Sequence, residues 1–314
     1  MRTVFFGTPE LAVPIADAVH ARHGVSAVVC QPDRPKGRSG RPSPPPVKVW
    51  AQERGIPVLQ PETPNTESFV LALRDLRPDM CVVAAYGRLV KQVLLDIPPL
   101  GWLNVHPSLL PRWRGPSPIQ TAVLEGDAET GVTIMRMTLE MDSGDLLAQQ
   151  RTVILPEETA EDLTGRLAVL AAEMMPDQMD RVLDGTAVFT PQDPGRVTYC
   201  KMFRKNHGYI RWDGSARRIH NRVRACVPWP AAQTLYKGQV CRILATRPES
   251  GEAGAAPGTV VEAAADTLRV ATGDGILAIL RFQAPGKKPL DMADFLRGHS
   301  IRPGERFEDI PDAD

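Results

Sequence analysis

The sequence predicts an α/β protein: a doubly wound, mostly parallel sheet over residues 1–184, followed by a small β-barrel domain over 205–314. In the first part, continuous apolar runs alternate with segments of helical spacing. In the second part, short strand-like runs follow one another with little helix between them. A linker over 185–204 contains Pro191 and Pro194, and 314 residues are enough for two separate hydrophobic cores.

Apolar runs in the first part are unbroken, as in strands that are buried on both faces of a sheet. We expect strands at 3–7 (TVFFG), 25–31 (VSAVVCQ), 80–87 (MCVVAAYG), 101–105 (GWLNV) and 130–138 (TGVTIMRMT). Thr66 can cap a helix that ends before Pro78. Thr159 with Asp162 can cap another helix, which Pro176 should break or kink. Strands that alternate with helices indicate a Rossmann-like sheet.

Short runs in the second part have the spacing of a small barrel. A short strand (GYIRW, 208–212) and a helix from Ser215 come first. Further strands are predicted at 239–246 (QVCRILAT), 258–263 (GTVVEA), 266–272 (DTLRVAT) and 276–283 (ILAILRFQ). The last two are joined by Gly273-Asp274-Gly275, a hairpin signal, and 291–298 predicts a final short helix. This pattern favours an OB-like β-barrel.

The composition excludes several classes of protein. Hydrophobic residues make up 43% and charged residues 24% of the chain, as in ordinary globular proteins. The longest apolar stretch, MCVVAAY at 80–86, is too short to span a membrane, and MRTVFFGTPE does not resemble a signal peptide. Five scattered cysteines without a C-x-x-C pair indicate reduced thiols. We therefore expect a cytoplasmic protein without membrane contact. We also expect a monomer, although the composition does not indicate an oligomeric state.

Positive charge is concentrated in two segments, although the formal net charge is zero. Residues 201–248 contain eleven lysines and arginines against one acidic residue, Asp213. Residues 31–48 contain five against Asp33. A single basic segment is usually solvated surface. Two such segments in a neutral protein favour a polyanionic partner such as a phosphate backbone.

Three polar residues follow predicted strands and are candidates for a site. Asn104 and His106 alternate within one strand, so their side chains leave the same face, and Asp142 follows another strand in MDSGD. Taken alone, Asp142 with Gly144 would be a turn, and His106 would be a hydrogen-bonded core residue. Together they lie where carboxyl ends of strands can converge, which is where open α/β sheets bind ligands.

These side chains suit acyl transfer to a nucleophile that the substrate supplies. Asp142 can hold His106 in one tautomer, and the Asn104 amide and a His106 N–H can donate to an oxygen that becomes negative. Ser108 and Ser117 lie outside any G-x-S-x-G sequence, so neither is expected to be a nucleophile. His106 and Asp142 are too few for a metal site, so we expect no metal.

Several motifs carry a resemblance to a known family. NVHPSLLPRWRGPSPIQ at 104–120, GDAETGVTIMRM at 126–137 and MDSGDLL at 141–147 resemble the 10-formyltetrahydrofolate-dependent formyltransferases. Further matching stretches are GTPELAVP at 7–14, QPDRPKGR at 31–38, VVAAYGRL at 82–89, VRACVPWPAA at 223–232 and GKKPLDMADFL at 286–296. The resemblance spans nearly the whole chain, and within the family it is greatest to the members that formylate methionyl initiator tRNA.

The resemblance implies roles for particular residues. Asn104, His106 and Asp142 match the catalytic residues of the family. The site for the folate co-substrate is implied to comprise Ser108, Leu109, Leu110, Pro111, Tyr86, Gly87 and Leu89. A basic inserted loop at about 33–46 is implied to approach the tRNA acceptor stem, and the implied tRNA contacts are Arg34, Lys36, Arg38, Arg41 and Lys205.

The implied reaction is formyl transfer from 10-formyltetrahydrofolate, as co-substrate, to the α-amino group of methionyl initiator tRNA. A first alternative is a formyltransferase for a small amine, such as a nucleotide sugar or glycinamide ribonucleotide, which would need neither basic segment. A second is an inactive sheet of this type that only binds RNA, which would not need Asn104, His106 and Asp142 together. A formylation assay beside a gel shift with initiator and elongator methionyl-tRNAs distinguishes the three.

Overall fold

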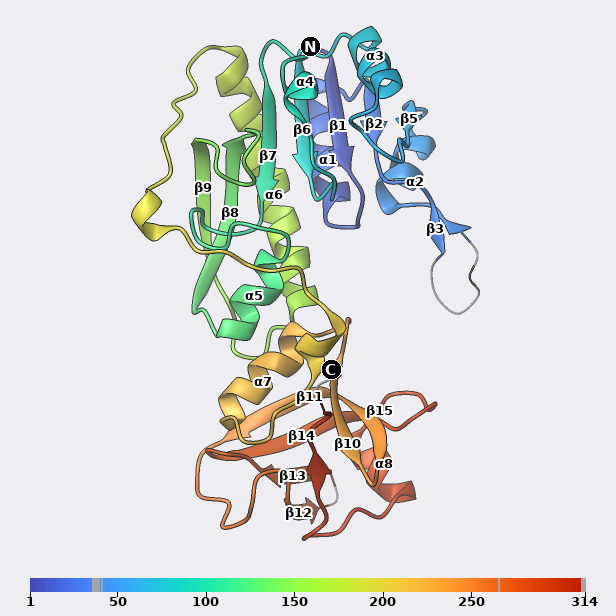
Figure 1. Ribbon diagram of the computed structural model, residues 1–314, viewed down its shortest axis with the longest axis vertical. Helices are drawn as coiled ribbons and strands as arrows, with labels where there is room; N and C mark the ends of the chain where they lie inside the picture. The colour runs from blue at the N-terminus through green and yellow to red at the C-terminus, as the bar shows by residue number, and fades with distance from the viewer. Residues whose placement is uncertain (36–39, 41, 265, 312–314) are drawn as a thin grey trace. The chain divides into compact units, whose positions relative to one another are not determined.

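The computed structural model describes residues 1–35, 40, 42–264 and 266–311 (Figure 1). Its tertiary contacts divide the chain into two compact units. The first comprises Met1–Pro118, Glu129–Val153 and Thr164–Lys201, and the second comprises Ile119–Ala128, Ile154–Leu163 and Met202–Asp314. Two short segments from within the predicted first domain therefore belong to the second unit, which no sequence pattern indicated.

The first unit is built on a seven-stranded sheet in the order β5-β2-β1-β6-β7-β8-β9. β5, β2, β1, β6 and β7 pair in parallel, and β8 and β9 continue the sheet in antiparallel fashion. The strands are β1 (Thr3–Gly7), β2 (Ala27–Val29), β5 (Val58–Leu59), β6 (Met80–Ala84), β7 (Trp102–His106), β8 (Glu129–Arg136) and β9 (Leu146–Val153). The predicted doubly wound, mostly parallel sheet is confirmed, although β9 was not predicted.

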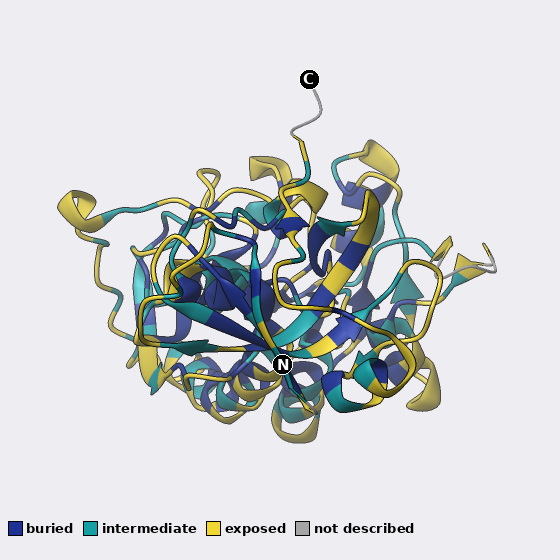
Figure 2. Ribbon diagram, turned by 90° about the horizontal axis from the view of Figure 1, so that it is seen from below, coloured by how far each residue is buried: buried dark blue, intermediate teal, exposed yellow. Residues whose placement is uncertain are grey.

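The central strands are covered on both faces, as their unbroken apolar sequences predicted. Every residue of β1 and of β6 is buried. Buried residues are dark blue in Figure 2, and several strands in the interior have this colour. The ring of Phe6 packs against the rings of Tyr86 and Trp102 at centroid distances of 5.3 and 4.7 Å. This packing links β1 to the segment after β6 and to the start of β7.

Helices connect the strands, and their expected caps are present. They are α1 (Ala12–His23), α2 (Pro46–Glu53), α3 (Glu67–Asp75), α4 (Gln92–Leu95), α5 (Pro118–Glu125) and α6 (Ala160–Leu183). The Thr66 hydroxyl accepts a hydrogen bond from Phe69 N at the start of α3. At the start of α6, Thr159 N donates to Asp162 Oδ2 and Asp162 N donates to Thr159 Oγ1, which is a reciprocal cap. A short ladder, β3 (Arg34–Pro35) with β4 (Pro42–Ser43), lies in the basic loop.

We expected Pro176 to break or kink the helix; it does not break it, because α6 continues through it to Leu183. A proline inside a helix removes one backbone hydrogen bond and costs about 3 kcal/mol. Tertiary contacts offset this cost: Met175 and Met179 are fully buried, and the Pro176 carbonyl lies 3.1 Å from His23 Nε2. Such contacts are invisible in a local sequence pattern.

The second unit contains an antiparallel sheet in the order β12-β13-β14-β11-β10-β16, with β15 also paired to β14. Its elements are η2 (Lys205–Gly208), α7 (Ala216–Ala225), β10 (Ala232–Tyr236), β11 (Gln239–Glu249), β12 (Val260–Ala264), β13 (Thr267–Ala271), β14 (Ile276–Gln283), β15 (Leu290–Asp291), α8 (Met292–Gly298) and β16 (Phe307–Glu308). Its core includes Trp212, Ile243, Leu277 and Phe282, all nearly or fully buried. The curled sheet confirms the predicted OB-like fold.

Local predictions in this unit had mixed outcomes. β13 and β14 form the expected antiparallel hairpin around Gly275, and the Ser215 side chain caps α7 by accepting from Arg218 N. The strand expected at 208–212 is wrong, since only an isolated bridge between Tyr209 and Gln233 forms there. Trp212 N donates instead to the side chain of Asp309. This backbone N–H is therefore bonded to a side chain and not to a neighbouring strand.

Within the described part of the chain, we find no helix whose length and hydropathy would let it cross a membrane.

Candidate active site

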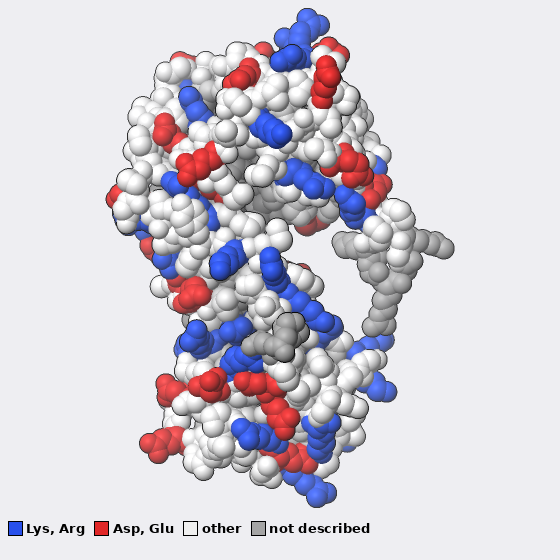
Figure 3. Space-filling model, viewed as in Figure 1, with Lys and Arg blue, Asp and Glu red and all other residues white. Residues whose placement is uncertain are grey.

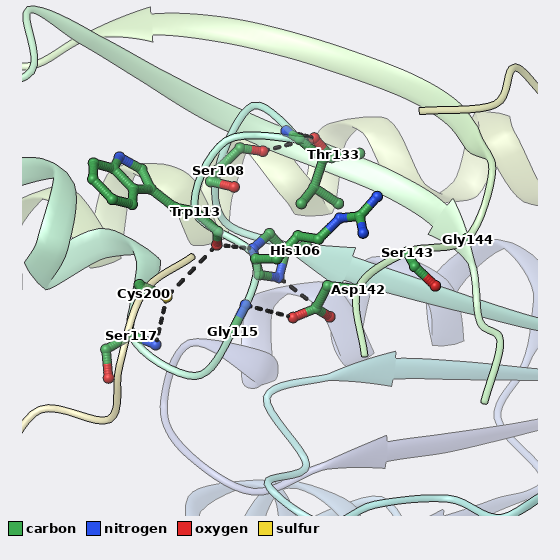
Figure 4. Close-up of polar contacts among 12 residues, drawn as sticks. His106, Ser108, Trp113, Gly115, Ser117, Thr133, Asp142, Ser143, Gly144 and Cys200 are labelled. Carbon is green, nitrogen blue, oxygen red and sulfur yellow. Dashed lines mark hydrogen bonds and ion pairs between the residues drawn. The ribbon is translucent and has the colours of Figure 1, made fainter. Parts of the chain in front are cut away.

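His106 ends β7 and is 4% exposed. Its Nε2 lies 2.9 Å from the Trp113 carbonyl oxygen, and its Nδ1 lies 3.6 Å from Asp142 Oδ1 (Figure 4). A carbonyl oxygen can only accept a hydrogen bond, so Nε2 carries the hydrogen and donates it. In the neutral ring, the lone pair of Nδ1 therefore faces the carboxylate of Asp142.

Asp142 lies in the loop between β8 and β9 and has a left-handed backbone, with φ of 51°. Its Oδ2 accepts a hydrogen bond from Gly115 N at 2.9 Å, which leaves Oδ1 toward His106. One carboxylate thus connects the loop after β7 with the imidazole at the end of that strand. A non-glycine residue at positive φ is uncommon and occurs where surrounding contacts determine the backbone.

Burial lowers the pKa of His106 below its usual 6.5, while the Asp142 charge and the Trp113 carbonyl act in the opposite direction. Desolvation is the largest of these causes because it disfavours the charged ring. The imidazole is therefore neutral at pH 7. A neutral Nδ1 and the Asp142 carboxylate are two proton acceptors that face each other.

Asn104 lies two residues before His106 in β7, so both side chains leave the same face of the sheet. Its backbone pairs with Val83 and Met135 of the neighbouring strands. The residue is partly exposed, and we find no hydrogen bond from its side chain to the rest of the described chain. Its two amide N–H groups are thus available to a ligand.

The predicted folate stretch, residues 108–111, is fixed by two residues that sequence reasoning missed. Thr133 Oγ1 donates to Ser108 O at 2.6 Å and accepts from Leu110 N at 3.1 Å. Gln149 Nε2 donates to Leu110 O at 2.8 Å and to Thr133 Oγ1 at 2.9 Å. The Ser108 hydroxyl is fully buried and donates to Arg112 O, so it shapes the loop from inside.

Leu109 and Pro111 are partly exposed, whereas Leu110 is buried and joined to Pro111 by a cis peptide bond. No signal in the sequence marked Thr133 or Gln149, because each lies in a β-strand far along the chain.

After the end of β6, the backbone of residues 86–87 and the exposed side chain of Leu89 are the groups that a ligand could contact. The Tyr86 ring is buried in the core, where desolvation raises its pKa to about 12, and its hydroxyl has no partner among the described residues. The Tyr86 carbonyl accepts hydrogen bonds from Thr8 Oγ1 and Gln31 Nε2. Gly87 has φ of 76°, and Leu89 is 67% exposed. Only the backbone of Tyr86 can therefore face a ligand at this edge.

The basic residues proved to be of two kinds. Arg222 donates to the His207 carbonyl, and the buried Arg224 donates to the carbonyls of Leu155 and Glu158, so both stabilise the second unit. Other basic side chains are exposed: Lys201, Arg204, Lys205, Arg217 and Arg218. On the face shown in Figure 3, lysines and arginines are interspersed with acidic residues.

The inserted loop is described only in part. Arg34 is exposed and forms an ion pair with Glu62 at 3.2 Å. The predicted contacts Lys36, Arg38 and Arg41 lie outside the described residues. Asp33 accepts hydrogen bonds from Lys48 and Gln60, which fix the start of the loop.

In the part of the chain that the structure describes, no three His, Cys, Asp or Glu side chains are grouped so that they could hold a metal ion. All five cysteines are buried free thiols.

Comparison with known proteins identifies the family. The family model described as formyl transferase matches residues 1–179, and the model described as formyl transferase, C-terminal domain, matches residues 202–300. This chain belongs to the formyl transferase family.

Two relatives of this formyl transferase match it almost end to end. The methionyl-tRNA formyltransferase of Sorangium cellulosum (strain So ce56) is 42% identical over 306 residues, covering 97% of this chain and 98% of the relative. The methionyl-tRNA formyltransferase of Thermus thermophilus is 42% identical over 310 residues, covering 99% and 100%.

Solved structures support the same fold. A variant of HypX from Aquifex aeolicus aligns with a TM-score of 0.67 at 19% identity, over 96% of this formyl transferase and 49% of that longer chain. WlaRD, a sugar 3N-formyl transferase, aligns with a TM-score of 0.67 at 16% identity, over 92% and 99%.

The geometry of this formyl transferase allows two kinds of chemistry at one edge of the sheet. The facing acceptors, His106 Nδ1 and Asp142 Oδ1, can together take up one proton. The free amide of Asn104 can donate hydrogen bonds to a developing negative oxygen. We expected a His106 N–H to donate to this oxygen as well. In the structure, the Nε2–H of His106 donates instead to the Trp113 carbonyl.

Proposed function

We propose that this chain transfers the formyl group of 10-formyltetrahydrofolate to the α-amino group of methionine on initiator tRNA, a step of translation initiation. One observation supports this most: identity of 42% with methionyl-tRNA formyltransferases extends over 97% of the chain or more, including the C-terminal domain. A formyltransferase for a small amine would have no need of the exposed lysines and arginines found there.

His106 and Asp142 act in this proposal as the proton acceptor. The methionine nitrogen attacks the formyl carbon and loses a proton as the new C–N bond forms. The imidazole, neutral because it is buried, takes up this proton beside the Asp142 carboxylate, which stabilises the resulting cation. The pair then returns the proton to N10 of the folate as the bond between N10 and the formyl carbon breaks.

Asn104 acts as the hydrogen-bond donor to the oxyanion. The formyl oxygen becomes negative in the tetrahedral intermediate, and a fixed amide N–H stabilises it more than it stabilises the uncharged carbonyl. The residue is held by β7 within a sheet that is buried on both sides, so its position changes little during the reaction. We assign this role to Asn104 and not to His106 because the only N–H of the neutral imidazole is already bonded to Trp113.

The folate co-substrate fits the edge formed by the ends of β6 and β7. The loop 108–111 is held from behind by Thr133 and Gln149, so its backbone is fixed before a ligand arrives. Leu89 offers an exposed apolar side chain for a flat ring, and Gly87 takes a positive φ at a position where a Cβ would come within 2.6 Å of the Gln31 amide nitrogen.

The tRNA contacts proposed are Arg34 and Lys205, which are exposed, together with Lys36, Arg38 and Arg41. Because this substrate is found where translation occurs, we place the protein in the cytoplasm, and we propose that it acts as a monomer and without a metal ion.

A formylation assay with the purified chain tests the proposal. Its components are 10-formyltetrahydrofolate and methionyl initiator tRNA, with a nucleotide-linked amino sugar and glycinamide ribonucleotide as alternative acceptors. We expect formyl-methionyl-tRNA, rates unchanged by a chelator, and no turnover of the small amines. Transfer to a small amine without transfer to tRNA would replace the proposed acceptor, and tRNA binding without any transfer would favour an RNA-binding protein.

A further inference from the structure

Gln192 lies in the segment after α6, in residues 190–200, which we call the strap. Its Oε1 accepts hydrogen bonds from Arg114 Nε at 3.0 Å and Arg114 Nη2 at 2.9 Å. Its Nε2 donates to the carbonyl oxygens of Asp142 and Gly144, each at 2.8 Å. One side chain thus connects the loop after β7, which contains Arg114, with the loop after β8, which contains Asp142.

All hydrogen-bonding positions of the Gln192 amide are used. An amide has two acceptor sites on its oxygen and two N–H donors, and here each meets a partner. A flipped amide would place its NH₂ against the arginine donors and its oxygen against two carbonyls. The orientation is therefore determined, and no other amino-acid side chain of similar size offers the same four bonds.

The backbone of the strap contacts the same two loops. Thr190 pairs with Leu146 through two hydrogen bonds of 2.8 and 2.9 Å beyond the Asp142 loop. Arg114 N donates to Thr198 O, and Cys200 N donates to Arg114 O, at 2.9 and 2.8 Å. The strap therefore lies across both loops, and Gln192 joins them in addition to the hydrogen bond between Gly115 N and the Asp142 carboxylate.

The conformation of Asp142 gives this contact a consequence. Asp142 has φ of 51°, a left-handed backbone region that is unfavourable for residues other than glycine. From that backbone position its carboxylate faces His106, and Gln192 bonds the carbonyl of the same residue. We infer that Gln192 is a positioning residue for the formyl transfer proposed above, one that holds Asp142 against His106.

The main test compares kinetic constants of wild type and Gln192→Ala with methionyl-tRNA and 10-formyltetrahydrofolate. Displacement of a catalytic group by about 1 Å costs on the order of 100-fold in rate. We therefore expect kcat to fall by about 100-fold while both KM values stay near those of wild type. Gln92→Ala is the matched control, because it also loses a glutamine hydrogen bond, to Asp96, but on the surface helix α4.

The effect should depend on Asp142, which a merely structural role would not explain. In an Asp142→Asn background, Gln192→Ala should cost little further activity, because the group that it positions is already lost. Gln192→Glu covers the case in which the alanine variant does not fold. It keeps an acceptor for Arg114 but lacks the donors to the two carbonyls, so it should show the same loss of kcat.

A measurement without substrate separates this inference from the proposed function. NMR titration of the His106 ring, assigned with His106→Ala, should give a lower pKa in Gln192→Ala, because the Asp142 charge that raises this pKa moves away. An unchanged His106 pKa, or a loss of kcat that is equally large in the Asp142→Asn background, would overturn the inference. If wild type itself fails to formylate methionyl-tRNA, the proposed function is wrong, but the titration still decides the role of Gln192.

Discussion

Two histidines, one in each unit, are buried in closely similar surroundings. His106 is 4% exposed and His220 is 2% exposed. In each ring, Nε2 lies within hydrogen-bonding distance of a backbone carbonyl oxygen. The distance is 2.9 Å to Trp113 O for His106 and 3.0 Å to Pro156 O for His220. Burial is the largest cause of a lowered pKa in both.

The two rings differ at Nδ1. In His220 this nitrogen lies 3.1 Å from the Thr246 hydroxyl, which can donate to it, so both ring nitrogens are satisfied. In His106 it faces Asp142 Oδ1 at 3.6 Å, and neither atom carries a hydrogen in the neutral state. A hydroxyl partner can donate a hydrogen bond to Nδ1, as expected for a structural histidine. A carboxylate partner cannot donate, so Nδ1 and the carboxylate can together take up one more proton. Burial and a perturbed pKa alone do not distinguish the two roles.

The largest expected effect is on catalysis. His106→Ala should lower the single-turnover rate of formyl transfer by about 10²–10⁴-fold, the usual range for removal of a general base. His220→Ala should leave this rate near that of wild type, since the polar partners found for its ring among the described residues are Thr246, Pro156 and Glu157. Equal losses in the two variants would break the distinction between a functional and a structural histidine.

Asn104→Ala should lower the rate by about 10²–10³-fold, the effect of losing one donor to an oxyanion. The change tests whether His106 works with an amide on its own face of β7. Binding of both substrates, measured separately by titration, should be unchanged. If the variant loses folate affinity and keeps its rate, Asn104 belongs to the binding site and not to the chemistry.

For stability, we expect the larger loss from His220→Ala and the smaller loss from His106→Ala. His220→Ala leaves the buried Thr246 hydroxyl without its ring partner, and an unsatisfied buried group costs about 1–3 kcal/mol. Urea denaturation followed by fluorescence should therefore show a lower midpoint for His220→Ala than for wild type. Thr246→Val is the milder companion variant. A midpoint equal to that of wild type would show that the ring is dispensable to packing.

Both histidines should weaken the fold in mild acid, which is the smallest effect. Each folded-state pKa lies below 6.5, so the unfolded chain binds a proton first, and stability falls as pH falls below 6.5 until the folded ring is protonated. One such proton changes stability by at most about 1.4 kcal/mol per pH unit. His220→Gln should reduce this slope in denaturation curves between pH 7 and 5, and an unchanged slope would contradict the assignment. Because burial lowers the pKa of His106, the transfer rate should fall only at more acidic pH than the usual value of 6.5, where the folded ring becomes protonated.

Much of the fold could be predicted from local sequence. Unbroken apolar runs specified β1 and β6, since only strands covered on both faces tolerate them, and polar caps marked the starts of α3 and α6. Predictions failed where distant contacts decided the outcome. Pro176 remains helical because residues on both sides of it are buried, and 119–128 packs with the second unit because its partners, among them Asn221, lie far along the chain.

By itself, the sequence determined which residue types follow which strands, because strand periodicity places Asn104 and His106 on one face and parallel strands end at one edge. It also determined the family, through motifs along the whole chain. Only the tertiary structure decided how these groups meet: the Trp113 carbonyl takes the His106 hydrogen, Asp142 adopts positive φ, and Gln192 joins the two loops. Those contacts link residues that are 7 to 78 positions apart and depend on hydrogen-bond directions that no local pattern encodes.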